Sequence, residues 1–354
     1  MHDHHIHLFA TAAALRSARC SPEDARDRAG LRIALQQQAP DARGWVRGVG
    51  YHESVAGNLD RSALDALLPD RPLRVQHRTG QSWILNSRAV ERLGLDRDET
   101  TPSGVERDAA GYATGRVYRS DTWLRERIGP GAPPSLADVS RRLAGLGVTA
   151  VTDATPCNGP DEVAAFAAAR ARGELSQRVV VMGTLELSEV QPPPGIVIGP
   201  VKIHLADAEL PDPDAVIAGI RAAHARRRNV AIHAVTRVVL VFALAAYEAA
   251  GVCAGDRLEH VHVAPPECIA AIARLGLTAC VHPDLIEARR AQWLRDAERE
   301  DAQWLGRVDL LREAGVALLA GSDAPHGRLA PVSMGQVAPD MEVCGPAKFL
   351  PALA

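Results

Sequence analysis

The stretch Asp3-His4-His5-Ile6-His7-Leu8 decides the fold prediction, because it places two histidines at alternate positions near the start of the chain. On an extended strand the side chains alternate between faces, so His5 and His7 project from the same face. Two neutral imidazoles on one side of a strand can bind one metal cation together. The pair alone is a weak signal, and the competing interpretation is a solvated, histidine-rich N-terminal tract.

Further potential metal ligands occur within later apolar runs or at their ends, and they strengthen the interpretation of the histidine pair. They are Lys202, His233, His260 and Asp323. Imidazole and carboxylate ligands suit zinc, and also manganese or iron. A lysine ammonium is a poor ligand and is costly to bury unpaired. Lys202 makes chemical sense if its amine reacts with carbon dioxide, because the two oxygens of the resulting carbamate could bridge two cations.

Plainer interpretations compete with these assignments. His233 could be an ordinary core histidine, and Asp323 could merely cap a turn. His262 faces the same way as His260 if that segment is extended, although the Arg-x-Glu-His context favours His260. His204 shares the face of Lys202 in the same manner.

Composition describes a globular protein and excludes several classes of function. Of the 354 residues, 47% are hydrophobic and 23% are charged, and the net charge is −3. Such a balance argues against nucleic acid or an anionic membrane as a partner. No apolar run approaches the roughly 20 residues of a membrane span.

Compartment signals are consistent with one another. The start, Met1-His2-Asp3-His4, lacks the basic and then apolar pattern of a secretory signal. The six cysteines include no Cys-x-x-Cys pair, which in a chain of this size suggests reduced thiols. We therefore expect a cytoplasmic protein.

The second half of the chain alternates short apolar runs with Ala-rich helical segments. The predicted strands are 148–154, 178–184, 200–205, 229–234, 257–261, 277–282 and 316–323, and the predicted helices are 135–145, 161–172, 214–227, 238–250, 266–275 and 304–314. This alternation indicates βα units with parallel strands. With residues 3–8 as the first strand there are eight, the number that a closed (β/α)8 TIM barrel requires.

One long segment interrupts that rhythm, because residues 15–140 are far too many for a βα connection. Within it, residues 24–38 and 87–95 look helical, residues 45–51 and 73–77 look like strands, and residues 104–117 resemble a hairpin. We interpret it as an insertion that grows from the first βα loop and lies over the active-site mouth. The barrel domain with its insertion would span residues 1–335, and residues 336–354 would form a C-terminal tail.

Six stretches, taken in order, carry a resemblance to a known family. They are Asp3-His4-His5-Ile6-His7-Leu8, Gly44-Trp45-Val46-Arg47-Gly48-Val49-Gly50, Trp83-Ile84-Leu85-Asn86-Ser87, Val201-Lys202-Ile203, Arg257-Leu258-Glu259-His260 and Gly321-Ser322-Asp323-Ala324-Pro325. The chain resembles the amidohydrolase superfamily, specifically the amidohydrolase-3 group of YtcJ-like and N-substituted formamide deformylase-like proteins. The ordered set, which extends over most of the chain, is far more specific than any single motif.

The resemblance implies a barrel of the metal-dependent hydrolase type with a binuclear centre, which we expect to hold two zinc ions, with manganese or iron as alternatives. The implied ligands are His5, His7, Lys202 as a carbamate, His233, His260 and Asp323. Water bound at such a centre has its pKa lowered to roughly 7. Asp323 would accept its proton as general base and deliver it to the leaving nitrogen.

Departures from the family pattern bear on the substrate rather than on the metal site. Arg237 replaces an acidic residue after the fifth strand, and Gln81 replaces a histidine that would contact substrate. The Asp-Gly pair after the bridging lysine has become Ala206-Asp207-Ala208. Family members also carry a small β-sandwich built from both chain ends, and we expect it to be missing here.

Three interpretations of the function follow. The first is a hydrolase that cleaves a C–N bond in a small molecule, an amide or formamide. The second is a mononuclear deaminase-type barrel in which Lys202 is unmodified, and the third is a non-catalytic barrel that binds a small molecule. A homodimer is expected if loss of the sandwich exposes an apolar surface. The expected substrate-binding residues are His77, Gln81, Trp83 and His282.

Overall fold

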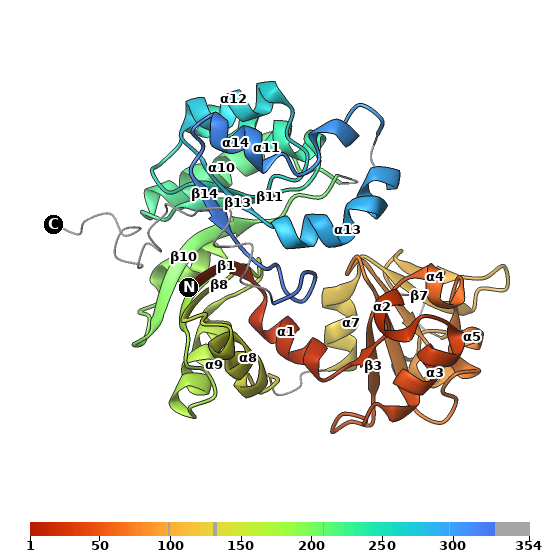
Figure 1. Ribbon diagram of the computed structural model, residues 1–354. Coiled ribbons are helices and arrows are strands. Elements are labelled where there is room, and N and C mark those ends of the chain that lie inside the picture. The colour runs from red at the N-terminus through yellow and green to blue at the C-terminus, as the bar shows by residue number, and fades with distance from the viewer. Residues whose placement is uncertain (98–99, 130–132, 208, 297, 330–354) are drawn as a thin grey trace. The chain divides into compact units, whose positions relative to one another are not determined.

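The computed structural model describes residues 1–97, 100–129, 133–207, 209–296 and 298–329 (Figure 1). The predicted tail, residues 336–354, and Ala208 of the altered Asp-Gly position lie outside the described residues. The chain divides into two compact units, one of Met1–Thr11 with Ser135–Ala354 and one of Ala12–Pro134. Each unit is described by itself, and the position of the insertion over the barrel mouth stays a prediction.

The first unit is built on an eight-stranded sheet whose neighbouring strands pair in parallel. In sheet order the strands are β1 (His2–Ile6), β8 (Ala150–Asp153), β9 (Arg178–Gly183), β10 (Ile196–Ile203), β11 (Val230–Ala234), β12 (Arg257–His260), β13 (Thr278–Val281) and β14 (Leu318–Ala320). The backbone N–H of Asp323 donates to His5 O at 2.8 Å, and that of His7 donates to Ala324 O at 2.9 Å. These bonds join the segment after β14 to β1, so the predicted (β/α)8 barrel is confirmed.

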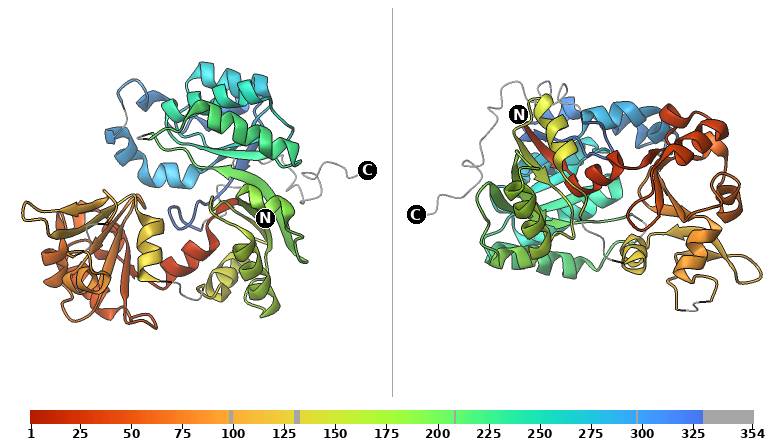
Figure 2. Two further views of the ribbon diagram at one scale, coloured as in Figure 1. Left: turned by 180° about the vertical axis from the view of Figure 1, so that it is seen from behind. Right: turned by 90° about the horizontal axis from the view of Figure 1, so that it is seen from below.

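Helices alternate with the strands along this part of the chain, and most of them lie on the outside of the sheet (Figure 2). They are α1 (Leu8–Leu15), α8 (Ala137–Gly145), α9 (Pro160–Ala171), α10 (Pro213–Ala225), α11 (Arg237–Ala250), α12 (Pro266–Leu275), α13 (Pro283–Asp296) and α14 (Val308–Glu313), with the 3-10 helices η1 (Leu185–Glu189) and η2 (Ala302–Trp304). Helix α9 shows why such segments begin where they do: Pro160 occupies its first turn, and the Glu162 carboxylate accepts from Gly159 N at 2.8 Å.

Most predicted barrel elements are confirmed, with three differences. Strand β10 begins at Ile196, before the predicted start at Pro200, and β14 ends at Ala320, so Asp323 lies beyond the strand rather than closing it. Helix α13 was not predicted, because six of its 14 residues are charged and its apolar residues form no continuous stripe.

The second unit contains a six-stranded mixed sheet. In sheet order its strands are β2 (Ala18–Arg19), β3 (Val46–Tyr51), β4 (Leu73–His77), β5 (Ser82–Leu85), β7 (Ala113–Tyr118) and β6 (Val105–Arg107). Its helices are α2 (Pro22–Ala25), α3 (Arg28–Gln37), α4 (Glu53–Ala56), α5 (Arg61–Asp65), α6 (Ser87–Leu93) and α7 (Asp121–Ile128). The predicted hairpin is confirmed as β6 and β7. The helix predicted over residues 24–38 is interrupted at Arg26, whose φ is 55°.

One motif of the insertion has a structural role. Asn86 is fully buried, and its side chain accepts from Ala89 N and Leu73 N, both at 3.0 Å. Its amide donates to the carbonyls of Leu68 and Arg71, each at 2.9 Å. Asn86 therefore caps α6 and ties that helix to β4 and to the loop before it.

None of the described helices is both long enough and apolar enough to cross a bilayer.

Closure of the barrel leaves no room beside Gly321. A Cβ placed there would lie 2.5 Å from the Cβ of His5 and 2.7 Å from its backbone N. We expect Gly321→Ala to destabilise the barrel by about 1–3 kcal/mol, since rigid backbone must move. Urea denaturation measures the change. Gly219→Ala in α10 is the control, because its Cβ would meet nothing within 4 Å, and it should stabilise by about 0.5–1 kcal/mol. Equal stability of the Gly321 variant and the wild type would contradict the expectation.

Candidate metal centre

A carboxylate and two imidazoles meet where β1 joins the segment after β14. The Oδ1 atom of Asp323 lies 3.5 Å from His5 Nε2 and 3.3 Å from His7 Nε2. His5 and Asp323 are buried and His7 is partly buried. These three are one of the groups of described residues whose ligand atoms lie within 4.8 Å of one another.

The spacing of these atoms fits a metal ion. Zinc ligands lie about 2.0–2.1 Å from the ion in a tetrahedron, which puts neighbouring ligand atoms about 3.3–3.4 Å apart. The separations of 3.3 and 3.5 Å between Asp323 and the two imidazoles match that value. Thr155 Oγ1 lies 3.0 Å from His7 Nδ1 and so leaves Nε2 of that ring available to a cation.

Glu259 holds the other nitrogen of His5. Its Oε2 lies 2.5 Å from His5 Nδ1, and its Oε1 accepts from Arg257 Nε. Arg257 also donates to His4 O at 2.8 Å. A carboxylate on the far nitrogen of a histidine fixes the tautomer and orientation of a metal ligand. Glu259 therefore aims Nε2 of His5 at Asp323.

The charges around Glu259 favour its ionised form. Burial alone would raise the pKa of Glu259, but Arg257, Lys202 and His5 hold it well below its usual value. Burial would likewise raise the pKa of Asp323, and the hydrogen bond from His7 and the neighbouring histidines keep it well below its usual value. Both carboxylates are consequently negative at neutral pH.

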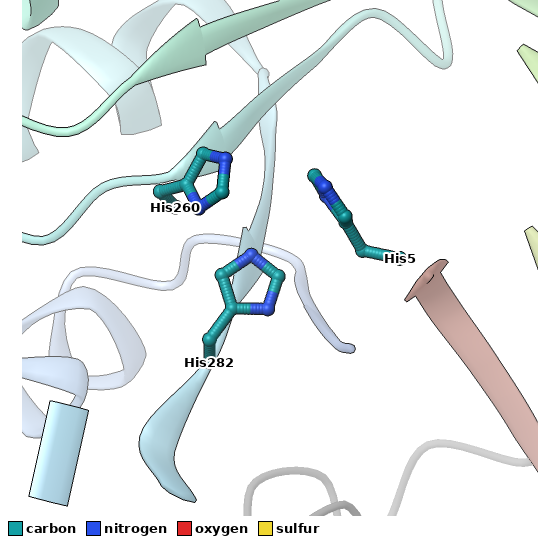
Figure 3. Close-up of side chains that lie close together, drawn as sticks. All are labelled: His5, His260 and His282. Atoms are coloured by element: carbon teal, nitrogen blue, oxygen red, sulfur yellow. The ribbon is translucent and has the colours of Figure 1, made fainter. Parts of the chain in front are cut away.

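A second group consists of His5, His260 and His282, which reach one another from three different strands (Figure 3). His5 is the last residue but one of β1, His260 ends β12, and His282 directly follows β13. The ring centroids lie 4.6–4.9 Å apart. His282 Nδ1 lies 2.8 Å from Gly321 O, whereas its Nε2 and the Nδ1 of His260 are buried without a hydrogen-bond partner in the described part of the chain.

The histidines of this region suit metal binding because they are neutral. Burial first, and the charge of Lys202 next, lower the pKa of His5 to about 3. Burial lowers the pKa of His260 and of His233 well below 6.5, and the next causes are the neighbouring rings at His260 and Lys202 at His233. Neutral imidazole is the form that binds metals.

His233 and Lys202 lie beside this group. The His233 ring centroid is 4.3 Å from that of His260 and 4.4 Å from that of His204. Lys202 is buried near the end of β10, and its Nζ has no hydrogen-bond partner within the described ranges. Burial lowers the pKa of Lys202, which favours the uncharged amine. His233 and Lys202 thus reach the cluster, while their role as metal ligands stays a prediction.

Backbone strain gathers at the same place. Six non-glycine residues of the described chain have positive φ, and three of them are His260 at 76°, Val261 at 49° and Asp323 at 52°. Such conformations cost about 1–3 kcal/mol each and persist where the surroundings enforce them, often at functional sites.

The other predicted substrate residues belong to the second unit. His77 Nε2 lies 3.3 Å from Glu53 Oε2, and Gln81 is exposed. Trp83 is buried in the apolar core of that unit and donates from Nε1 to Asp121 Oδ1 at 2.7 Å. Whether these three side chains contact substrate stays a prediction, as does the same role for His282 of the barrel.

Sequence reasoning overlooked Thr155 and Trp293, which carry no motif that identifies them. Cys280, which its apolar run marks as a core residue, is buried and lies in a third group with His5 and Glu259. The alternative of a solvated N-terminal tract, in which His2 and His4 would face solvent, is wrong: His2 is buried with Nε2 2.9 Å from Thr152 Oγ1, and His4 is partly buried. The reason is that both faces of a barrel strand are covered.

Comparison with known proteins shows the family. The model of the amidohydrolase family matches residues 1–351, so the chain belongs to that family. The crystal structure of an uncharacterized metal-dependent hydrolase from Pyrococcus horikoshii OT3 is similar at a TM-score of 0.74 and 20% identity, covering 95% of this chain and 73% of that one. A second, from Pyrococcus furiosus, has a TM-score of 0.71 and 20% identity, covering 98% and 78%. At this identity the likenesses show the barrel fold. No curated protein matches the chain.

Removing the charge of Glu259 should weaken metal binding. We expect Glu259→Gln to lower metal affinity about 10–100-fold, because His5 loses its anionic partner. It should also lower stability by about 3–5 kcal/mol, since Arg257 is left as an unpaired buried charge. Competition with a chromogenic chelator measures the affinity. Glu248→Gln, on the exposed partner of Arg274, should change neither quantity; an unchanged affinity in the Glu259 variant would refute the assignment.

Proposed function

We propose that this protein is a metal-dependent hydrolase that cleaves a C–N bond, of amide or formamide type, in a small molecule. The carrying observation is the Asp323 carboxylate, held 3.3–3.5 Å from two imidazole nitrogens where the barrel closes. Membership of the amidohydrolase family supports hydrolysis as the reaction. In such barrels the residues at the C-terminal ends of strands perform the chemistry.

The proposed ligands divide by position. His5, His7 and Asp323 have the spacing of one coordination sphere, and His233 and His260 would provide the ligands of a second cation. Lys202, as a carbamate, would bridge the two. A divalent ion bound there, zinc in our proposal or manganese or iron, polarises a carbonyl and makes water more acidic.

The remaining chemistry belongs to the side chains. Asp323, ionised at neutral pH, accepts a proton from the attacking water and returns it to the leaving nitrogen. Glu259 and Thr155 hold the rings of His5 and His7 in orientation throughout. His282, with one nitrogen near Gly321 O and the other unpartnered among described atoms, is suited to contact the substrate carbonyl.

A mononuclear deaminase-type barrel is the second candidate. The buried Nζ of Lys202 has no partner among the described residues, as expected of a plain amine as well as of a lysine awaiting carboxylation. Small-molecule binding, a homodimer and a cytoplasmic location remain predictions.

Asp323 can be tested by substitution. We expect Asp323→Asn to reduce turnover by at least about 100-fold, because the amide cannot accept the proton. The measurement is a screen of metal-loaded protein against N-formyl and N-acyl amines, with circular dichroism to check the fold. Asp309→Asn, on the exposed partner of Arg307, should retain activity. Comparable turnover in the Asp323 variant would remove it as base, and no turnover by wild type on any C–N or ester substrate would favour a binding protein.

Metal stoichiometry separates the two candidates. A binuclear centre bridged by Lys202 should hold two ions per chain after reconstitution in bicarbonate, whereas a mononuclear centre should hold one. Lys202→Met should reduce two ions to one, since methionine cannot form a carbamate. Elemental analysis after gel filtration measures the count, and mass spectrometry measures the carbamate. A wild-type count of one, unchanged by the substitution, would support the mononuclear reading.

A further inference from the structure

His262 is a buried histidine whose two ring nitrogens both lack a hydrogen-bond partner in the described chain. It is 2% exposed. His5 and His282 differ from it, because each has one nitrogen near a fixed partner, Glu259 or Gly321 O. A buried polar group left unsatisfied is costly and calls for an explanation.

The backbone conformation before His262 determines where its ring lies. Strand β12 ends at His260, and the next two residues do not continue it, since His260 and Val261 have φ of 76° and 49°. The expected alternation, which put His262 and His260 on one strand face, is therefore wrong. Gly306 N then fixes the turned segment by donating to His262 O at 2.7 Å.

The surroundings of His262 are those of a contact residue rather than of a metal ligand. Its ring centroid lies 5.3 Å from that of His260 and 6.1 Å from that of His282. It belongs to none of the groups of described residues whose ligand atoms converge within 4.8 Å. On another side the indole of Trp293, in α13, lies 4.5 Å away centroid to centroid and inclined by 38°.

We propose that His262, supported by Trp293, hydrogen-bonds a polar group on the nitrogen substituent of the substrate and so determines specificity. The inference rests on the proposed C–N hydrolysis. In a formamide the acyl side offers nothing further to recognise, so a polar group that His262 recognises must lie on the nitrogen substituent. The substrate class is then formamides whose nitrogen substituent carries a carboxamide-like group close to the scissile bond.

The imidazole gives this preference a physical basis. A neutral ring offers one N–H donor and one acceptor nitrogen. A carboxamide can accept from the first through its oxygen or donate to the second through its NH2 group. An alkyl substituent of the same shape would leave both nitrogens unsatisfied. Sites built around a hydrogen bond discriminate strongly against analogues that lack it.

Two matched probes test the proposal. N-formylglycinamide and N-isobutylformamide have nearly the same shape and differ in carboxamide against isopropyl. Wild-type, metal-loaded protein should prefer the carboxamide by about tenfold or more in kcat/KM, the effect of one hydrogen bond. His262→Phe should abolish that preference by slowing the carboxamide substrate alone.

A merely structural role would not produce that pattern. His262→Asn and His262→Gln place amide groups near the two ring nitrogens, and at least one should restore part of the preference. Metal content should stay at the wild-type value in all three variants, and the melting temperature of His262→Phe should be no lower than that of the wild type. Retained preference in His262→Phe, or lost metal in the variants, would overturn the assignment.

Calorimetric titration of both probes separates this inference from the proposed function. If wild type hydrolyses neither probe and no N-formyl or N-acyl amine of the screen, but binds N-formylglycinamide more tightly than its partner, and His262→Phe loses that difference, C–N hydrolysis fails and the role of His262 stands. If wild type binds or hydrolyses the two probes equally, or engages neither, the inference fails whatever reaction the protein catalyses.

Discussion

The buried contact between Glu259 and its two partners, Arg257 and His5, is the constraint on which the rest of the centre depends. It links β12 to β1 inside the barrel, and the bond from Arg257 to His4 O fastens the same strand. A fully buried charge is tolerated only when it is paired and hydrogen-bonded. Glu259 thereby determines where the ring of His5 points, so the orientation of this candidate ligand depends on a buried charge pair that the fold must keep intact.

The barrel and the convergence of its site were predictable because they follow from strand ends. In parallel β/α units every strand delivers its last residues to one rim, so polar residues at the ends of apolar runs must meet. His5, His233 and His260 were located in this way. The same reasoning brings Lys202 to the cluster, although its chemical form cannot be read from its neighbours in sequence.

Predictions failed where local backbone departs from the regular period. The alternation rule requires an extended chain, and it fails for His262 because two left-handed residues precede it. Asp323 was expected to close the eighth strand because it ends an apolar run, but it lies three residues past the end of β14. Helix α13, which contains Trp293, was not predicted because the apolar residues in its sequence form no continuous stripe. The second unit was recognisable as an insertion from its length, yet its relation to the barrel mouth depends on contacts that no local pattern encodes.

The placement of that insertion has a consequence for how the molecule forms. In the sequence, His5 and His7 come before the second unit, residues 12–134. Every other residue of the centre comes after that unit. Pairing β1 with β8 must close this long loop, and closure costs entropy that grows with the logarithm of loop length. An insertion that has already folded holds its own two ends in place and lowers that cost. Strand β1 is therefore expected to join the barrel late, after the second unit has folded.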